Sequence, residues 1–466
     1  MAMQSATTYD MPKDYYFGGG TQDSSVAPLA AVILLVAIVL MFCLPRKRII
    51  IPFLAAGVLL PFGLNIVLLG LHFPALRLLV ATGFFRFVLR RDIPVPRLNS
   101  IDKAFLFWAL CNAIAFSILW RSMGAVTNRL GFLWTTLGTY FVVRFLIRDK
   151  DDVVRVIRTL AILMLVIAPC MLVEHFTQHN YFFVVGSSPL AAIRDGAIRA
   201  NGPFRHPIIA GTVGAMLLPL FVGLWWQGKR HRTLVGFGVA ASIGMAIASA
   251  SSTPLMTTAA GVMALMLWPF RSRMRYFRWG LVLIIISLQL VMKAPVWMLI
   301  SRTGGAIGGS GYHRAMLIDN FIRHFGEWWL IGTQNNAAWG YDMWDVDNAY
   351  VAAGVSGGLI TFVAFIAILV YAYKRIGKSR RLARKSPKDE HFIWAIGACL
   401  FANTVGYFGI VYFDQSMLIW YALLAMVSAT ALFVDAQKKT PAPQTSAAGG
   451  NTVNEFTSAA LLHTGK

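Results

Sequence analysis

Apolar runs of about 17–25 residues, separated by short polar stretches, repeat along nearly the whole chain. Because lipid offers no hydrogen-bond partner to a free backbone group, runs of this length are expected to cross a membrane as α-helices. The pattern predicts spans at residues 26–45, 49–71, 74–89, 104–120, 128–146, 153–173, 207–226, 233–250, 254–270, 280–298, 348–373, 391–412 and 416–435. The third run is short and contains Arg77 and Arg86. The pattern therefore predicts an all-α polytopic membrane protein with about 12–13 transmembrane helices.

Composition and charge agree with this fold class. Of the 466 residues, 57% are hydrophobic and only 13% are charged, which leaves too little polar surface for a soluble protein of this length. The formal net charge of +22 comes from short clusters of Lys and Arg at the ends of the apolar runs. No nucleic-acid recognition motif accompanies these clusters. We therefore expect bilayer lipids as their partners, and no nucleic acid.

The distribution of Lys and Arg predicts one orientation, with the N-terminus outside and the strongly basic connections in the cytoplasm. In this arrangement a mildly acidic external segment is followed by ten spans with an external loop, a large external loop, three spans with a basic cytoplasmic loop, and a disordered cytoplasmic tail. The corresponding ranges are 1–25, 26–298 with the loop at 174–206, 299–347, 348–435 with the basic loop at 374–390, and 436–466. Long loops on one face are where function concentrates.

The first long loop contains the segment "RDGAIRANGPFRHPIIAG" at 194–211. It places Arg194, Arg199, Arg205 and His206 close together on the side where positive charge is otherwise scarce. These residues either anchor the loop to lipid head groups or form an anion site, since arginine forks pair bidentately with phosphate oxygens. Pro207 suits the first turn of the helix that follows.

The second long loop contains "GYHRAMLIDNFIRHFGEWWLIG" at 311–332. Its hydrophobic periodicity predicts an amphipathic helix that lies on the membrane or over the transmembrane helices. Arg323 falls on the polar face, whereas Arg314 falls in the middle of the apolar stripe. Because burial of a lone charge is costly, Arg314 is expected to have a partner or a water-filled cavity, and a functional role.

The stretch "DVDNAYVAAGVSGG" at 345–358 directly precedes an apolar run. Asp347 or Asn348 can serve as the N-cap of the helix that begins near Ala349. Alternatively, a carboxylate at the outer end of a helix can act as a general base. Asp345 and Asp347 form an Asp-x-Asp pair, so a divalent metal is conceivable, but two carboxylates are a weak metal signal, and we expect no cofactor.

Taken in order, these segments resemble the O-antigen ligase and polymerase superfamily, whose members act on undecaprenyl-diphosphate-linked glycans. The resemblance extends from about Asp102 to the last span and includes "YFVVRFLIRDKDDVVRVIRTL" at 140–160, both loop segments and the start of the helix after the large loop. In the ligases that helix opens with His-Asn, with leucine at the fifth position and glycine at the twelfth. This chain has Asp347-Asn348, with Val351 and Gly358 at those positions.

Two departures distinguish the chain from a strict ligase. Asp347 stands where the ligases have a histidine thought to activate the acceptor, and "ASASSTPLMTT" at 248–258 lacks the arginine that usually lies there. An aspartate-asparagine version looks more like the branch that joins repeat units of O-antigen or exopolysaccharide. The resemblance implies a GT-C-like fold in a bacterial inner membrane, with periplasmic long loops and inverting transfer. We expect this transfer to be metal-independent.

Both the residue chemistry and the resemblance suggest roles for individual side chains. Arg199, Arg205 and Arg314 would stabilise charge on the leaving diphosphate. Asp347 would accept the proton of the acceptor hydroxyl, a role that His206 or His313 could share or replace. Asn348 would contact the substrate. Trp328 and Trp344, with Trp329 and Trp339, would either stack on sugars or lie at the interface as membrane proteins commonly place them.

Three functions remain open from the sequence. The favoured one is a polymerase of surface polysaccharide repeat units, and the nearest alternative is a ligase that transfers a finished glycan to lipid A core or another acceptor. A transporter of lipid-linked glycan or a non-catalytic export component is the third. Other polysaccharide assembly proteins are further candidate partners.

Overall fold

Each predicted span contains a helix in the part of the chain that the structure describes. The computed structural model describes residues 26–61, 65–68, 71–91, 98–301 and 311–439, so the N-terminal segment 1–25 and the tail from 440 lie outside the described residues. The span helices are α1 (Pro28–Cys43), α2 (Arg46–Leu59), α3 (Ala75–Arg90), α4 (Ser100–Trp120), α5 (Met123–Leu146), α6 (Lys150–Thr177), α7 (Pro207–Leu224), α8 (Arg232–Ala248), α9 (Ser252–Met266), α10 (Met274–Val291), α14 (Ala349–Leu382), α15 (Pro387–Gly406) and α16 (Gln415–Lys439). Within the described residues, six helices are long and apolar enough to cross a membrane. The chain is therefore an α-helical, multi-pass membrane protein.

Local sequence explains where several of these helices begin. The side chains of Asn99 and Asp102 each accept from the other's backbone N–H and form a capping box at the start of α4. Asp149 caps α6 in a similar way. α7 begins at Pro207, as the sequence predicts, because proline fits the first helical turn.

Several helix ends differ from the predicted boundaries, and three of these differences are informative. The span expected at 49–71 ends as a helix at Leu59, and an antiparallel pair of strands follows, β1 (Asn65–Leu68) and β2 (Leu71–Pro74). The basic loop expected at 374–390 is mostly helical, since α14 continues to Leu382. α16 continues to Lys439, past the expected start of the tail at 436. Hydropathy does not separate a membrane span from a shorter helix that precedes an apolar hairpin, nor does it mark where a helix leaves the membrane.

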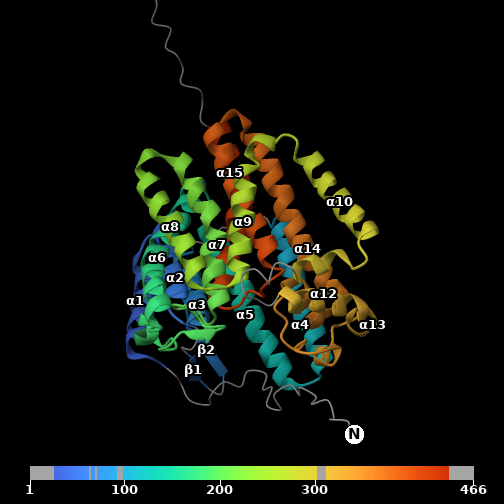
Figure 1. Cartoon of the computed structure of the whole chain (residues 1–466). Coiled ribbons are helices and arrows are strands. Elements are labelled where there is room, and N and C mark those ends of the chain that lie inside the picture. Colours follow the sequence, from blue (N-terminus) through green and yellow to red (C-terminus); the bar gives the residue numbers. More distant parts are fainter. Residues whose placement is uncertain (1–25, 62–64, 69–70, 92–97, 302–310, 440–466) are drawn as a thin grey trace, which may run out of the picture.

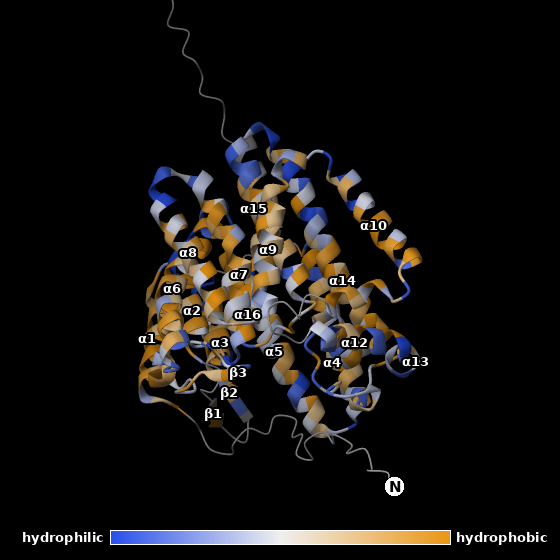
Figure 2. Ribbon diagram, in the orientation of Figure 1, coloured by the Kyte–Doolittle hydropathy of each residue, from blue (hydrophilic) through white to orange (hydrophobic). Residues whose placement is uncertain are grey.

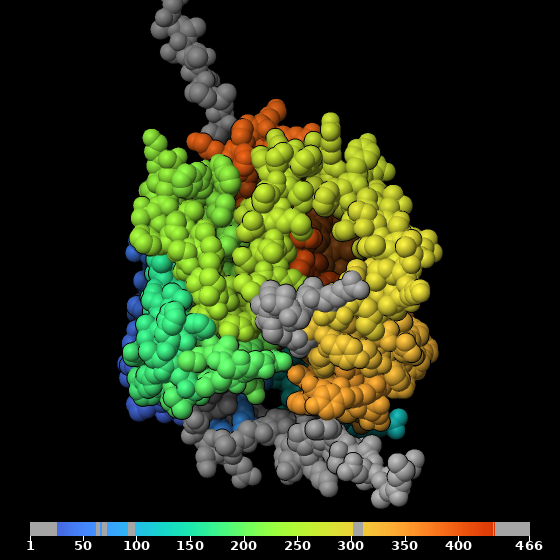
Figure 3. Space-filling model, viewed as in Figure 1, coloured from blue at the N-terminus to red at the C-terminus, as the bar shows by residue number. Residues whose placement is uncertain are grey.

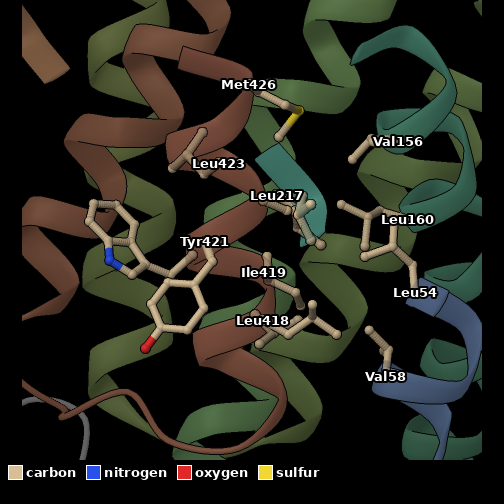
Figure 4. Packing of buried hydrophobic residues seen from close by; sticks show 14 of the residues in the cluster. Leu54, Val58, Val156, Leu160, Leu217, Leu418, Ile419, Tyr421, Leu423 and Met426 are labelled. Carbon is tan, nitrogen blue, oxygen red and sulfur yellow. The ribbon is translucent and has the colours of Figure 1, made fainter. Parts of the chain in front are cut away.

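The core of the bundle forms around α7 and α16. Figure 4 shows buried apolar side chains from four helices that meet there, namely Leu54 and Val58 of α2, Val156 and Leu160 of α6, Leu217 of α7, and Leu418, Ile419, Tyr421, Leu423 and Met426 of α16. Ala422, Ala425 and Ala429 of α16 are fully buried, and these small side chains let the neighbouring helices approach closely. In lipid, such close packing is the main attraction between helices.

One helix stands apart from this bundle. No residue of α10 is buried, and Figure 1 shows it separated from the other helices at one side of the molecule. Figure 2 shows that most residues of α10 are hydrophobic. In Figure 3 a hollow lies between the yellow part of the chain that includes α10 and the yellow-green part, and orange-red residues are visible at its back. The bundle is thus open to the side next to α10.

The large loop folds over the bundle as a small unit. α12 (Gly311–Arg323) ends where His324 leaves helical geometry, and α13 (Phe325–Trp328) forms a separate short turn. The single amphipathic helix expected at 311–332 is therefore wrong beyond Arg323. The reversal lets Trp328 stack on Phe321, with ring centroids 3.9 Å apart, and donate to the Phe321 carbonyl at 2.7 Å. These two residues form an apolar cluster with Leu317, Trp339, Met343 and Val351.

A break in α14 receives the end of this loop. Gly358 has φ 74° and ψ −172°, a conformation that only glycine adopts readily. The break frees backbone groups on both sides, and the loop satisfies them. Leu359 N–H donates to the Trp329 carbonyl at 2.7 Å, and Thr333 N–H donates to the Val355 carbonyl at 2.9 Å. The loop and the first segment of α14 are consequently held in one position.

Candidate functional site

A buried ion pair joins the large loop to the start of α14. Arg314 of α12 is 4% exposed, and its Nε donates to Oδ2 of Asp347 at 3.2 Å. Its Nη1 donates to the hydroxyl of Ser252, the first residue of α9, at 3.1 Å. The expectation that Arg314 needs a partner is confirmed. The pair brings together three segments that are far apart in the sequence.

The second oxygen of Asp347 is not used by this pair. Oδ1 is buried without a hydrogen-bond partner among the described residues, and Nε2 of His313 lies 3.7 Å away. Burial raises the pKa of the Asp347 carboxyl to about 6, against the opposing effects of the Arg314 and His313 charges. His313 Nε2 also lies 3.0 Å from the backbone carbonyl of Asp345. Asp347 is therefore held by one oxygen and has the other available to accept a proton near neutral pH.

The helix cap is a different residue. Asn348 Oδ1 accepts from the N–H groups of Tyr350 and Val351, at 3.0 and 3.2 Å. Its Nδ2 lies 3.5 Å from the Phe408 carbonyl, and Asn348 is only 1% exposed. Of the two residues that the sequence offered as caps, Asn348 is the one used. Asp347 is left for the ion pair, and the side chain of Asn348 is occupied by the backbone.

The first long loop supplies a second buried arginine. Arg199 closes the short hairpin of β3 (Ala192–Arg194) and β4 (Ala197–Arg199), and its Nη2 donates to Ser251 at 2.7 Å. Its Nε is buried without a partner among the described residues. Arg199 and Arg314 thus contact consecutive serines, Ser251 and Ser252. Burial and the Arg194 charge lower the pKa of Arg199, and the Arg314 charge adds to this effect.

A carboxylate that sequence reasoning missed holds this loop in place. Glu174, fully buried near the end of α6, accepts from the backbone N–H groups of Asn201 and Gly202 at 3.0 and 2.8 Å. Asn180 Nδ2 donates to the Gly202 carbonyl at 2.9 Å. Gly202 has φ 54°, as the predicted turn requires. Glu174 and Asn180 therefore hold the turn between Arg199 and His206 in place.

His206 has a structural position at the start of α7. Its Nδ1 accepts from Ile208 N–H at 3.2 Å and caps the helix. Burial lowers the pKa of His206 to about 4, and the charges of Arg199 and Arg194 contribute. Because Nδ1 is occupied and the ring is neutral at physiological pH, His206 would offer Nε2–H as a donor and is poorly suited to accept a proton.

Three helices begin around these arginines and carboxylates. Thr253 near the start of α9 donates to the Gly409 carbonyl at 3.1 Å, and Ala349 N–H at the start of α14 donates to the Tyr407 carbonyl at 2.9 Å. Gly211 in the first turns of α7 lies directly against Ser249, just before α9. Helix N-termini carry partial positive charge, so they add to the field of the arginines. The combined arrangement favours an anionic group.

Asp414, between α15 and α16, is a second carboxylate that the sequence analysis overlooked. Its Oδ2 is buried without a hydrogen-bond partner among the described residues. Burial raises its pKa to about 7, although the charge of Arg205 acts to lower it. Its φ of 52° is unusual for a residue with a side chain. The next residue, Gln415, donates to the Pro203 carbonyl at 3.0 Å, which places Asp414 beside the Arg205 turn. The sequence signal that could have identified Asp414 is a lone acidic residue in a short connection that the distribution of Lys and Arg predicts to be external.

The tryptophans divide into two groups. Trp328 is 3% exposed and Trp339 is 6% exposed, and Trp339 donates to Glu327 at 2.8 Å. Both have packing roles within the loop. Trp344 and Trp329 are 49% and 46% exposed, so these two of the four candidates for sugar stacking remain accessible.

Metal binding at this site is not tested by the geometry. Among the described residues, no group of three or more His, Cys, Asp or Glu side chains comes together. Asp347 is engaged by Arg314, and Asp345 is exposed. The expectation of no cofactor, with a divalent metal only weakly supported at this pair, stays a prediction.

No family model matches the chain, and no curated protein matches it. The superfamily resemblance therefore remains an interpretation of the motifs.

Proposed function

We propose that the protein is a glycosyltransferase that polymerises repeat units of a surface polysaccharide, O-antigen or exopolysaccharide. The donor would be an undecaprenyl-diphosphate-linked glycan, and the reaction would take place at the periplasmic face of a bacterial inner membrane. The observation that carries this proposal is the buried Arg314–Asp347 pair, in which one carboxylate oxygen is held and the other has no hydrogen-bond partner among the described residues. A proton acceptor and an anion-binding group thus lie side by side.

The proposed reaction is a direct displacement. The acceptor hydroxyl oxygen attacks the anomeric carbon of the donor, and the bond from that carbon to the diphosphate oxygen breaks. The hydroxyl proton passes to Oδ1 of Asp347, and undecaprenyl diphosphate leaves with the bonding electrons. Arg314 and Arg199 lower the barrier by stabilising the charge that develops on the departing diphosphate. Both are preorganised, since Ser252 and Ser251 already fix their side chains.

The surroundings suit a substrate attached to lipid. The multi-pass helices place the ion pair within a membrane protein, and the hollow beside α10 in Figure 3 opens the bundle to the side. A donor with a polyprenyl tail would remain in the bilayer while its diphosphate and sugar reach the arginines. Trp344 is exposed near the pair and would contact the glycan.

A ligase is the second candidate, and one observation favours it. The ligases of the resembling superfamily have a histidine where this chain has Asp347. Here His313 of α12 comes within 3.7 Å of the Asp347 carboxylate, so an imidazole is present although it belongs to another segment. Polymerase and ligase would share the donor and the proton transfer, and they would differ in the acceptor.

A deletion strain that carries either the wild-type gene or Asp347→Asn, at matched protein level, tests the proposal. Asparagine keeps the size of the side chain but removes the proton acceptor. Lipid-linked and surface glycans are separated on a gel. We expect the variant to accumulate single repeat units on the lipid carrier and to lack long polymer. Arg323→Gln is the matched control, because Arg323 is on the same helix, α12, but on its polar face, where 71% of its side chain is exposed.

The other outcomes discriminate among the alternatives. Full-length polymer that stays on the carrier would indicate a ligase. Normal surface glycan in the variant would contradict a catalytic role for Asp347. Loss of all external lipid-linked glycan, with repeat units retained inside, would indicate a transporter.

A further inference from the structure

A groove between two helices of the bundle is lined by residues other than those of the ion pair. It has a volume of about 550 Å³ and runs between α4 and α14, which pack along each other (Figure 1). Ala104 of α4 and Ala364 of α14 are nearly buried and form its floor. Phe107, Ile360 and Val363 are more than half exposed and form its walls. Small residues on two adjacent helices thus leave a slot that larger apolar side chains border.

The length of the groove matches one leaflet of a bilayer. Along α14 it extends from Leu359 to Tyr371, which at 1.5 Å per residue is about 18 Å. The hydrocarbon region of a whole bilayer is about 30 Å thick, so the groove spans roughly half of it. An apolar slot of this length fits one extended acyl chain.

One end of the groove is basic. Lys103 of α4 and Ser100 line it there, together with Tyr371. Lys374 Nζ lies 5.6 Å from the centre of the Tyr371 ring. Both lysines are exposed, and within the described residues neither takes part in an ion pair. This end belongs to the part of the chain that the distribution of Lys and Arg assigns to the cytoplasm.

We propose that this groove is a binding site for an anionic phospholipid of the leaflet at the basic end of the bundle. One acyl chain would occupy the slot, and the phosphate would lie between Lys103 and Lys374, with Ser100 as a hydrogen-bond donor. Charge complementarity selects an anionic head group, since basic residues at this membrane surface attract anionic lipids. The site is independent of the proposed glycosyl transfer.

The site also has a position from which it would support the ion pair. The groove begins at Leu359, directly after the break at Gly358. The segment of α14 before the break begins with the cap Asn348, next to Asp347. Above the break, Asn112 of α4 donates to Ser356 of α14 at 2.9 Å. A lipid in the groove would fill the space between the same two helices below the break.

Native mass spectrometry of the full-length protein, titrated in detergent with phosphatidylglycerol or phosphatidylcholine, tests this site. We expect the wild type to retain one phosphatidylglycerol molecule in preference to phosphatidylcholine. The double variant Lys103→Gln/Lys374→Gln should retain it roughly tenfold more weakly. Lys378→Gln/Lys388→Gln, which removes two exposed lysines at the same end, should retain it like the wild type.

A second pair of variants tests the slot itself. Ala367 lines the groove, and Ala367→Phe should fill it and abolish retention. Val370→Phe places the same bulk at an exposed position of α14 outside the groove and should have no effect. Equal retention of both lipids by the wild type, or unchanged retention in Ala367→Phe, would overturn the proposal. Preferential displacement of phosphatidylglycerol by undecaprenyl phosphate would also overturn it, since the groove would then hold the carrier.

Discussion

The two ends of the bundle use the same residue types in different ways. At the basic end, Asp102 accepts at both oxygens, from Asn99 N–H at 2.9 Å, Tyr140 OH at 2.5 Å and Arg144 Nε at 3.3 Å. Asp152 likewise accepts at both oxygens, one from Arg155 at 2.5 Å. Networks of this kind satisfy every lone pair that they bury.

At the opposite end, Asp347 and Asp414 each have a buried oxygen without a hydrogen-bond partner among the described residues. Both also have raised pKa values, because burial disfavours their charged forms. A carboxylate with hydrogen-bond donors at both oxygens joins helices. A carboxylate with one oxygen left without a donor has a lone pair available for a ligand or a proton. We therefore propose that Asp102 and Asp152 serve stability, whereas Asp347 and Asp414 serve binding and chemistry. Glu174, at the same end as Asp347, has donors at both oxygens and holds a loop.

The largest expected effect lies at Arg314. Arg314→Gln should lower the transfer rate by about 10²–10³-fold, because the departing diphosphate loses a preorganised cation. The transfer rate of Arg314→Lys should lie between those of the wild type and Arg314→Gln. Lysine keeps the charge, but it lacks the forked guanidinium that bridges Asp347 and Ser252. Transfer rates of purified protein, normalised to folded protein, measure this. If Arg314→Gln is as active as Arg323→Gln, the pair is structural and the comparison between the two ends fails.

A substitution at the basic end of the bundle should lower the free energy of unfolding. Asp102→Ala leaves Arg144 and Tyr140 buried without their acceptor and removes part of the α4 cap, and it should destabilise the fold by about 3 kcal/mol. Thermal unfolding in detergent measures the change. Asp151→Ala, at an exposed position in the first turn of α6, is the matched control. Normal unfolding of Asp102→Ala with reduced transfer per folded molecule would reverse the roles of the two ends.

The smallest effect concerns Asp414 and its dependence on pH. Its folded pKa of about 7 lies above the ordinary value of 3.8. The folded state therefore binds more protons between these values, and this contribution to stability is lost as the pH rises through 7. Asp414→Asn should stabilise the protein by about 1–2 kcal/mol at pH 8 and little at pH 5. Thermal unfolding at both pH values tests this, with the exposed Asp195→Asn as control. If the thermal stability of the wild type and of Asp414→Asn depends on pH in the same way, Asp414 does not have the raised pKa that distinguishes this end of the bundle.

Much of the fold follows from the sequence, because a lipid environment constrains it strongly. Length and hydropathy locate the helices, since only helices can bury their backbone in lipid. The hairpin after Leu59 and the end of α12 at Arg323 escaped prediction. Hydropathy marks neither of them: the hairpin pairs Leu68 with Leu71, and Trp328 stacks on Phe321, which requires the chain to reverse at His324.

Only part of the candidate site could be predicted from the sequence. Arg314 was identifiable because a charge in an apolar stripe needs a partner, and its partner proved to be Asp347. The choice of Asn348 over Asp347 as the cap and the bridging serines could not be predicted, since polar residues next to a helix start have several equivalent uses. Glu174 was hidden for another reason: it bonds backbone groups of a loop that the sequence does not place beside it.

The most direct measurement uses purified full-length protein and a synthetic undecaprenyl-diphosphate-linked repeat unit, and follows release of undecaprenyl diphosphate between pH 5 and 8. The wild type should release it and lengthen the glycan, with a rate that rises through pH 6 and is about tenfold lower at pH 5 than at its plateau, because Asp347 accepts a proton only when ionised. Asp347→Asn should release undecaprenyl diphosphate much more slowly, and its rate should not rise with pH. Release by Asp347→Asn at the wild-type rate across the whole range would contradict the account.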